Sequence, residues 1–380
     1  MALTETESNN KLVKYTKEIN REFVRENMFS PYMGTALNSI IRVRQELKSG
    51  GEQMNIPLVT KLRGQGVGAG TLVGNEEKID NYGMRLWVDW KRHAVATKKS
   101  DQHKDSADIF GEAKPLLSDW GKELQRDHLI EAFMALPSES APAGLGSDAG
   151  DPVNGIRYEA ASAAQRNAWN AANSDRVLYG NAVGNYNATH ATALATIDST
   201  DDTFVKGSVS LLKRIAKTAT PAIRPFKTRD GYEYFVAFAG TNAFRDLKAS
   251  LDTDHKDARP RSKENIIFQD GDLMYDGVIV REVPEISMYV TDVWTSLTTA
   301  GDSAGRVEPV FFCGQQAAVL GWGQMAKPTF RKEDDYGFIT GTGTEMCYGV
   351  SKMFKKHPMD GTDLKQWGVV TGFFSAPLDA

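Results

Sequence analysis

The chain has 380 residues, of which 45 are Lys or Arg and 49 are Asp or Glu, so its formal net charge is −4. This near balance produces no overall field of one sign, which argues against a free nucleic-acid binder or a protein of anionic membrane surfaces. The length is sufficient for one large domain or two smaller domains. Only two cysteines occur, Cys313 and Cys347, both among apolar residues, and this usage is typical of a reducing compartment rather than a disulfide scaffold.

Residues 1–48 begin with a polar stretch and then place single apolar residues between charged ones. The start does not resemble a secretory signal, and no run of about 18 apolar residues occurs anywhere, so we expect a soluble protein. Two interpretations of this segment remain. It is either an extended arm that leads into a short helix, or an amphipathic helix of an ordinary core, which the pattern alone favours.

The next segment predicts a two-stranded arm. Apolar and polar side chains alternate in residues 53–58 and again in residues 84–91, which is the period of a β-strand. Between these limbs lie four glycines, Gly64, Gly66, Gly68 and Gly70. They free the backbone and disfavour a packed tip. A two-stranded ribbon is marginal in water, so the arm requires another surface, either in this chain or in a neighbouring subunit.

A basic stretch and one long helix follow the arm. Residues 90–104 carry five Lys or Arg residues against one acid, and we interpret them as a solvated connection, with contact to phosphates or to an acidic partner as the alternative. Residues 105–136 predict a helix of roughly 45 to 50 Å that stops before Pro137. Asp105 or Ser106 is its expected cap, and Pro115 either kinks it or marks the start of its regular part. Its apolar face is formed by Ile109, Ala113, Leu116, Trp120 and Leu124.

The second half of the chain alternates short helices and strands. Residues 138–155, rich in Pro, Gly and Ser, predict a loop and a domain boundary. The Asp276-Gly277 pair predicts a hairpin turn. We expect helices over residues 158–178, 204–219, 242–251 and 316–325, and strands over residues 232–239, 273–282, 307–313, 337–354 and 367–374.

The arm glycines invite comparison with a phosphate-binding loop. Such a loop is followed by a helix N-terminus and, in the Walker type, contains a Lys-Ser/Thr pair. Here Gly70 is followed by Thr71-Leu72-Val73. We therefore predict no nucleotide site and no cofactor.

The chain also lacks a clear metal or catalytic motif. Asp252, Asp254, His255 and Asp257 could face a hard cation, but they lack the central glycine and final glutamate of a calcium loop, so a solvated acidic turn is the simpler interpretation. His93 and His103 do not have the spacing of a helical ligand pair. Neither cysteine has a nucleophile context, and the six histidines are scattered through the chain, which suggests no catalytic triad. We predict no metal site and no catalytic residue.

Several short blocks, taken in order, form a pattern that extends over most of the chain from about residue 30. The blocks in the first part are Gln53-Met54-Asn55-Ile56-Pro57-Leu58, Leu62-Arg63-Gly64, Gly74-Asn75-Glu76-Glu77 and Arg92-His93-Ala94-Val95. The later blocks are residues 173–180, Tyr234-Phe235-Val236-Ala237, Arg245-Asp246-Leu247, Asp276-Gly277-Val278, Gly314-Gln315-Gln316-Ala317 and Asp335-Tyr336-Gly337. Each block alone is weakly specific. The ordered set resembles the major capsid proteins of tailed bacteriophages, in particular the group typified by the podovirus N-four.

This resemblance implies the HK97-type capsid fold, an α+β fold with peripheral and axial domains. By likeness, its parts are an N-terminal arm (1–48), an extended β-hairpin loop (49–100), the spine helix of the peripheral domain (101–137), an axial domain with a β-rich core (138–325) and a return to the peripheral domain (326–380).

The resemblance also implies a structural rather than an enzymatic function. The chain would self-assemble into hexamers and pentamers of an icosahedral virion shell, in the host bacterial cytoplasm, around double-stranded DNA. Its partners would be further copies of itself, scaffolding, portal and decoration proteins, and packaged DNA at the inner face, with no membrane. The alternatives are an encapsulin-like cargo shell with the same fold, and an α/β enzyme using the 64–70 loop.

Flexible arms that lie over neighbouring subunits tolerate the slightly different environments within such a shell. We expect contacts between subunits at Gly64, Gly66, Gly68, Gly70, Trp87, Trp90 and Arg92. Trp87 and Trp90 lie on opposite faces of the returning strand, so our hypothesis is that they anchor the arm on its own subunit and on a neighbour. Some relatives crosslink a lysine in this region, where Lys61 and Lys78 lie, but ordinary solvated lysines are the simpler interpretation.

Overall fold

The computed structural model describes residues 22, 24–25, 27–59, 62, 64–79, 81–104, 109–227, 231–251, 268–269, 272–331, 335–356 and 364–379. The chain forms two compact units, each assembled from separate stretches. The first consists of Met1–Asn27, Lys91–Gln125 and Met325–Met346, and the second of Met28–Trp90, Arg126–Gln324 and Cys347–Ala380.

An eight-stranded sheet forms the centre of the second unit. Its order is β6-β17-β12-β8-β11-β10-β9, and β7 pairs with β8. Strand β12 is antiparallel to both neighbours, whereas β11 is parallel to β8 and β6 is parallel to β17. The strands are β6 (Val177–Tyr179), β7 (Phe226–Lys227), β8 (Glu233–Ala239), β9 (Phe268–Gln269), β10 (Asp272–Tyr275), β11 (Val278–Glu282), β12 (Val307–Cys313) and β17 (Val369–Ser375).

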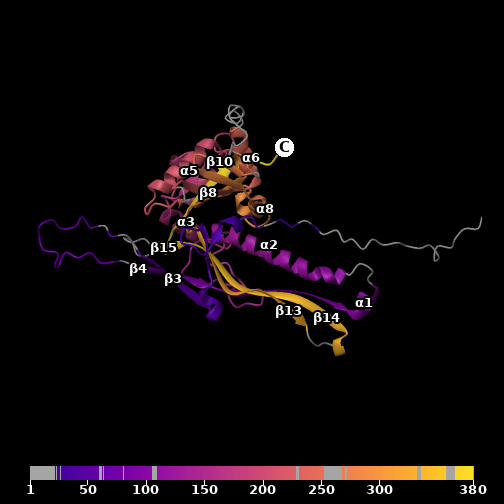
Figure 1. The fold of residues 1–380 in the computed structure, drawn as a ribbon. Helices are drawn as coiled ribbons and strands as arrows, with labels where there is room; N and C mark the ends of the chain where they lie inside the picture. Colours follow the sequence, from indigo (N-terminus) through magenta and orange to yellow (C-terminus); the bar gives the residue numbers. More distant parts are fainter. Residues whose placement is uncertain are drawn as a thin grey trace, which may run out of the picture. The chain divides into compact units, whose positions relative to one another are not determined.

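Both faces of this sheet are covered, and all seven residues of β12 are buried. On one face Val310 and Phe312 belong to a core cluster with Leu212 of helix α5 (Lys206–Thr218) and Phe244 of helix α6 (Thr241–Ser250). Figure 1 shows these helices beside the strands. Because side chains alternate along a strand, Phe311 points to the opposite face.

That opposite face is an aromatic cluster. Phe311 stacks on Phe133 with ring centroids 5.5 Å apart, and Phe29 meets Phe238 edge-on at 4.8 Å. Phe133 lies near the end of helix α2 (Ala113–Met134), and Phe29 belongs to the N-terminal part of the chain. All four rings are buried. The cluster therefore fixes the end of α2 and the segment around Phe29 on the central sheet.

A buried lysine completes the end of α2. In a continuing helix the Phe133 carbonyl would accept the N–H of residue 137, but that residue is Pro and has no N–H. Lys352 Nζ donates to this carbonyl instead, at 3.1 Å. Burial lowers the pKa of the Lys352 ammonium to about 7. The missing backbone donor is thus replaced by a side chain 219 positions away in sequence.

A second sheet has the order β1-β2-β13-β14-β5, and two hairpins, β3–β4 and β15–β16, stand outside these sheets. The remaining strands are β1 (Met33–Gly34), β2 (Ile41–Arg44), β3 (Gln53–Val59), β4 (Asn81–Trp87), β5 (Asp89–Lys98), β13 (Ala318–Arg331), β14 (Ile339–Lys352), β15 (Phe354–Lys356) and β16 (Leu364–Gln366). The remaining α-helices are α1 (Lys99–Lys104), α3 (Ala163–Ala172), α4 (His190–Ala195) and α8 (Pro284–Asp292). The 3-10 helices are η2 (Ser30–Tyr32), η3 (Glu46–Ser49), η4 (Ile109–Glu112), η5 (Val183–Asn185), η7 (Thr295–Leu297), η8 (Asp302–Ala304) and η9 (Asp335–Gly337).

Several predicted elements are confirmed. Strand β12 has the predicted bounds, and β8, β17, α5 and α6 lie within a few residues of their predicted positions. The Asp276-Gly277 turn joins β10 to β11, with φ of 49° and 70° at its two residues. Helix α2 starts at Ala113, so Pro115 lies in its first turn and marks its start, while Asp105 and Ser106 lie outside the described residues.

The predicted helix over residues 316–325 is wrong, because this segment belongs to strand β13. Residues 318–321 are all buried, and a continuous apolar run does not distinguish a strand from a helix. Two glycines in this segment, Gly321 and Gly323, indicate a strand that other residues approach closely. A Cβ on Gly321 would lie 2.6 Å from a Leu86 methyl, and one on Gly323 would lie 2.9 Å from Cys347 Sγ. These are close approaches within a packed sheet.

Three further expectations are corrected. The 158–178 helix is shorter, because Ser162 and Gln165 form a capping box at the start of α3 and the chain is extended again in β6. In the described part of residues 1–48 the chain forms β1, β2 and 3-10 turns, because β2 pairs in parallel with β13 and this tertiary pairing overrides helical spacing. Leu116 was predicted on the apolar face of α2, but it is 48% exposed. The buried residues in the first turns of this helix are Ala113 and Leu117.

A buried histidine links three segments of the second unit. His190 Nδ1 lies 2.7 Å from the Tyr179 hydroxyl, and Nε2 lies 2.9 Å from the Tyr158 hydroxyl. Since Tyr179 donates to Asn170 Oδ1, it accepts from Nδ1–H, and Nε2 accepts from Tyr158. The ring is therefore neutral. Burial, with the Arg166 guanidinium nearby, lowers the pKa of His190 to about 4.

This depressed pKa predicts a loss of stability in acid. The unfolded chain binds a proton at His190 near pH 6.5, whereas the folded chain does so near pH 4. As the pH decreases from 6.5 to 4, the free energy of unfolding should therefore decrease. His190 should account for up to about 3 kcal/mol of this decrease. His190→Gln cannot titrate, so it should show a smaller fall in chemical unfolding of dissociated subunits. An equal fall in both proteins would contradict the assignment.

Candidate assembly surfaces

The β3–β4 hairpin is the arm that the sequence pattern predicted. The two strands are antiparallel, with Gln53 opposite Trp87 and Val59 opposite Asn81. One face of the hairpin is buried, and it carries Met54, Ile56, Leu58, Met84 and Leu86. These side chains form one cluster with Val319 of β13 and with residues of the β15–β16 hairpin. The base of the arm is therefore packed within its own unit.

Two polar side chains, which the sequence pattern did not predict as functional, hold the returning limb of the arm. Asn154 Oδ1 accepts the Trp87 N–H at 2.9 Å, and Asn154 Nδ2 donates to the Trp87 carbonyl at 2.9 Å. Asp89 is buried, and its Oδ2 accepts the N–H groups of Gly146 and Asp151. For Asp89, the sequence did contain a signal, because a charged residue at a strand position that becomes buried needs polar partners. Asn154 gave no signal, because its partner lies 67 positions away.

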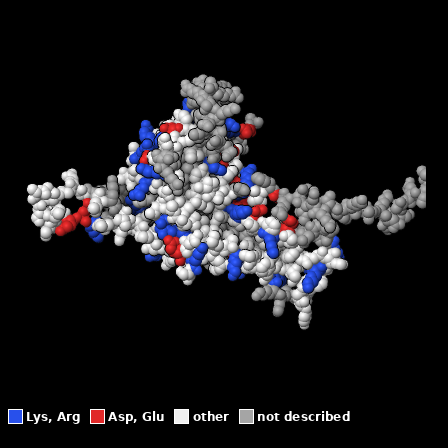
Figure 2. Space-filling model, in the orientation of Figure 1, with Lys and Arg blue, Asp and Glu red and all other residues white. Residues whose placement is uncertain are grey.

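The tip of the arm is open to solvent. Every described residue from 64 to 79 is exposed, and none belongs to a strand or helix. Figure 1 shows this segment continuing beyond the ends of β3 and β4, and Figure 2 shows it as mostly uncharged with an acidic patch. The acidic residues of the segment are Glu76 and Glu77. The exposed apolar side chains on and next to the tip are Val59, Leu62, Val67, Leu72, Val73 and Ile79. Such a concentration of exposed apolar surface is characteristic of an interaction site.

The seven predicted contact residues differ in their exposure. Gly64, Gly66, Gly68 and Gly70 lie in the exposed tip, and Arg92 is exposed on β5. Trp90 is 47% exposed, whereas Trp87 is 8% exposed and buried in its own unit. The returning limb is not one continuous strand, because β4 ends at Trp87 and β5 begins at Asp89. The two tryptophans therefore differ in what they can contact.

The first unit also exposes several large apolar side chains. The basic stretch predicted as a solvated connection is mostly exposed, and it forms strand β5 and helix α1, with backbone pairing such as Lys99 N–H to the Phe338 carbonyl (2.9 Å). Lys114 Nζ lies 5.4 Å above the Phe330 ring. The large exposed apolar side chains of β13, η9 and the segment before β14 are Met325, Phe330, Tyr336 and Phe338.

The candidate chemical groups do not converge into a site within the described residues. In the described part of the chain the glycine tip is followed by strand β4, and not by the helix N-terminus that follows a phosphate-binding loop. Asp252, Asp254, His255, Asp257 and Lys61 lie outside the described residues, and Lys78 is exposed. No group of side chains suited to a metal ion occurs in the part of the chain that the structure describes.

Both cysteines are buried and free. Burial raises the pKa of the Cys313 thiol and of the Cys347 thiol. A raised pKa lowers the thiolate fraction, so neither cysteine is activated as a nucleophile. Among the described helices, none is both long enough and apolar enough to cross a bilayer.

Comparisons with known proteins agree with this architecture. A family model described as phage capsid protein matches residues 4–371. The capsid asymmetric unit of cyanophage Pam1 is 35% identical, with both chains covered over 100% and a TM-score of 0.86. The capsid of Ralstonia phage GP4 is 18% identical over 98% of this chain and 97% of that chain, with a TM-score of 0.70. The capsid of Helicobacter pylori bacteriophage KHP30 is 11% identical over 97% and 96%, with a TM-score of 0.68. No curated protein matches the chain.

An α+β chain with an exposed arm, a long helix and a β-rich core, matched over its whole length by capsid subunits, is a structural shell protein of the HK97-type fold. The chain belongs to the phage capsid protein family and is a major capsid protein of a phage shell.

Proposed function

We propose that identical copies of this chain form the hexamers and pentamers of an icosahedral shell around double-stranded DNA, and that the β3–β4 arm joins neighbouring copies. The observation that carries this proposal is the tip, where Leu72 is 65% and Val73 is 81% exposed. Burial of apolar surface stabilises association by about 25 cal/mol per Å². A surface of another copy would remove these side chains from water, whereas their own subunit leaves them exposed.

The five parts implied by the sequence resemblance are included in this proposal. Residues 1–48 act as the N-terminal arm, 49–100 as the extended loop, 101–137 as the spine of the peripheral domain, 138–325 as the axial domain and 326–380 as the return. The β3–β4 hairpin supports the second assignment, and helix α2 supports the third. Seven strands of the eight-stranded sheet lie within residues 138–325 and support a β-rich axial domain there, whereas the eighth strand, β17, comes from residues 369–375.

Trp90, Arg92 and the tip glycines contact a neighbouring copy in this proposal, and Trp87 anchors the arm in its own subunit. The exposure of Trp90 and the burial of Trp87 support this division of roles. Many modest contacts made simultaneously give a shell a stability that no single contact reaches. Changes at Trp90 should therefore weaken assembly more than folding.

The proposed partners follow from the role in a shell. Scaffolding, portal and decoration proteins would meet the shell in the host bacterial cytoplasm, and packaged DNA would meet its inner face. Lys, Arg, Asp and Glu are intermixed on the face shown in Figure 2, and the net charge is −4. DNA contacts would therefore be few and sensitive to salt. We propose that the chain acts without catalysis, as a structural protein.

Replacing two tip side chains tests the role of the arm. Leu72→Ser combined with Val73→Ser should reduce the yield of closed shells at least tenfold, because a loss of about 1.4 kcal/mol per contact is tenfold in affinity and is repeated in every copy. Thermal unfolding of unassembled subunits should not change. Electron microscopy and size-exclusion chromatography of the expressed protein measure the yield of shells, and a melting curve followed by circular dichroism measures the thermal unfolding of the subunits. Val183→Ser is a matched control, because Val183 is apolar and 57% exposed in η5 of the same unit. A wild-type yield of shells from the double variant would contradict the proposed role of the arm. Wild-type protein that forms neither shells nor capsomers would contradict the proposed self-assembly.

The two tryptophans should respond differently to alanine. Trp87→Ala should lower the free energy of unfolding of the subunit by about 3 kcal/mol, because it empties a buried site. Trp90→Ala should change that free energy by about 1 kcal/mol or less, yet lower the yield and heat resistance of particles. Chemical unfolding of subunits and particle counts after heating separate the two effects. Particles of Trp90→Ala with wild-type yield and heat resistance would show that Trp90 contacts no neighbour.

A further inference from the structure

The short β15–β16 hairpin lies between the base of the arm and the eight-stranded sheet. Strand β15 contacts β4 of the arm, and β16 contacts helix α3. Phe354 of β15 and Leu364 of β16 belong to the same apolar cluster as the buried face of the arm. Movement of this hairpin would therefore move the base of the arm.

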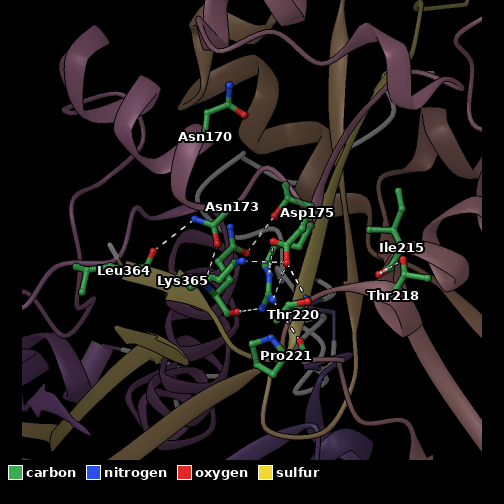
Figure 3. A network of polar contacts seen from close by, with 12 residues as sticks. Asn170, Asn173, Asp175, Ile215, Thr218, Thr220, Pro221, Leu364 and Lys365 are labelled. Atoms are coloured by element: carbon green, nitrogen blue, oxygen red, sulfur yellow. Dashed lines mark hydrogen bonds and ion pairs between the residues drawn. The ribbon is translucent and has the colours of Figure 1, made fainter. Parts of the chain in front are cut away.

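The polar side of this hairpin is held by one carboxylate. Lys365 Nζ of β16 lies 2.9 Å from Asp175 Oδ2, and the same oxygen accepts the Thr220 N–H at 2.8 Å. Asp175 Oδ1 accepts from Arg176 Nε at 3.1 Å. Figure 3 shows Asp175 between Lys365 and Thr220. The carboxylate thus joins three segments that are distant in sequence.

Backbone bonds strengthen the same junction. The Gln366 N–H donates to Asn173 Oδ1 at 2.8 Å, and the Arg176 guanidinium donates to the Gln366 carbonyl. Asn173, Arg176 and Gln366 have no exposed surface. The Thr371 N–H of β17 donates to the Arg176 carbonyl at 3.1 Å, so this junction is attached to the central sheet.

The charges at this junction are balanced in favour of the ionised carboxylate. Burial alone would raise the pKa of Asp175, but the Arg176 guanidinium, the Thr220 N–H and the Lys365 ammonium together lower it. The side chains of Lys365 and Asp175 are 9% and 28% exposed, so water screens this ion pair less than one on the surface. Charge-assisted hydrogen bonds of this kind are stronger than neutral ones.

We propose that Asp175 and Lys365 are positioning residues for assembly, which fix the β15–β16 hairpin on the central sheet and thereby the direction in which the arm leaves the subunit. This inference rests on the proposed role of the arm. An arm with a fixed base loses less conformational freedom when it binds a neighbour than one with a mobile base. The junction therefore prepares the arm for contact before a neighbour arrives.

Lys365→Met tests the inference, because it removes the ion pair while Asp175 continues to neutralise the buried Arg176. In unassembled full-length protein, amide exchange over residues 53–59 and 81–87 should become about tenfold faster, as expected for a lost charged hydrogen bond. Exchange in β12 should remain unchanged. Lys365→Arg, which retains the charge, should keep most of the protection. Closed shells of Lys365→Met should be fewer or irregular in electron micrographs.

Lys227→Met is the matched control. Lys227 pairs with Glu233 at 3.0 Å, but both side chains are largely exposed and lie on the β7–β8 pair. This variant should exchange and assemble like wild type. Unchanged exchange at the arm in Lys365→Met, or equally faster exchange in β12, would overturn the inference. Because exchange is measured on unassembled protein, this result is independent of whether the wild-type chain forms shells.

Discussion

The apolar contact between the β3–β4 arm and the β15–β16 hairpin is the interaction on which the rest of the structure depends. The arm alone is a two-stranded ribbon, which is marginally stable in water. Its buried face packs on Phe354, Leu364 and Val319 and so becomes part of a core, while its tip remains exposed. The same hairpin therefore has a packed base and a tip whose apolar side chains remain exposed to water. This combination suits a subunit that completes its burial in a shell.

The polar groups around this contact replace partners that the backbone does not supply. Lys352 donates to the Phe133 carbonyl where Pro137 has no N–H. Asn154 satisfies both backbone groups of Trp87 where β4 ends. Asp175 joins β16 to the segments around Arg176 and Thr220. Each is a buried or partly buried side chain whose loss would leave an unsatisfied donor or acceptor, which costs about 1–3 kcal/mol.

The spacing of apolar side chains predicted the elements that bury one face or are bounded by residues that end a helix or strand. The alternation in β3, the run in β12 and the stripe of α5 follow directly from the period of the side chains. Strand β13 was missed because its first four residues, 318–321, are all buried, which removes the alternation there. The open tip of the arm was also predictable, because four glycines within seven residues cannot form a packed core.

The contacts that root the arm were not predictable, because they join residues far apart in sequence. Asn173 and Gln366 are separated by 193 positions, and nothing in either local pattern indicates the other. Similarly, the alternation placed Trp87 and Trp90 on opposite faces but did not indicate which face is covered, whereas in the structure Trp87 is 8% and Trp90 is 47% exposed. Sequence similarity supplied the shell function, whereas the structure identified the arm residues that remain exposed.

The most direct test of the central claim is the accessibility of the tip before and after assembly. A Val73→Cys variant places a thiol at a side chain that is 81% exposed, while the two natural cysteines are buried and have raised pKa values. The rate of maleimide labelling should be high in unassembled subunits and at least about tenfold lower in closed shells, because a neighbouring copy covers the tip. Equal labelling rates in subunits and shells would show that the tip stays in solvent and that the arm does not join neighbouring copies.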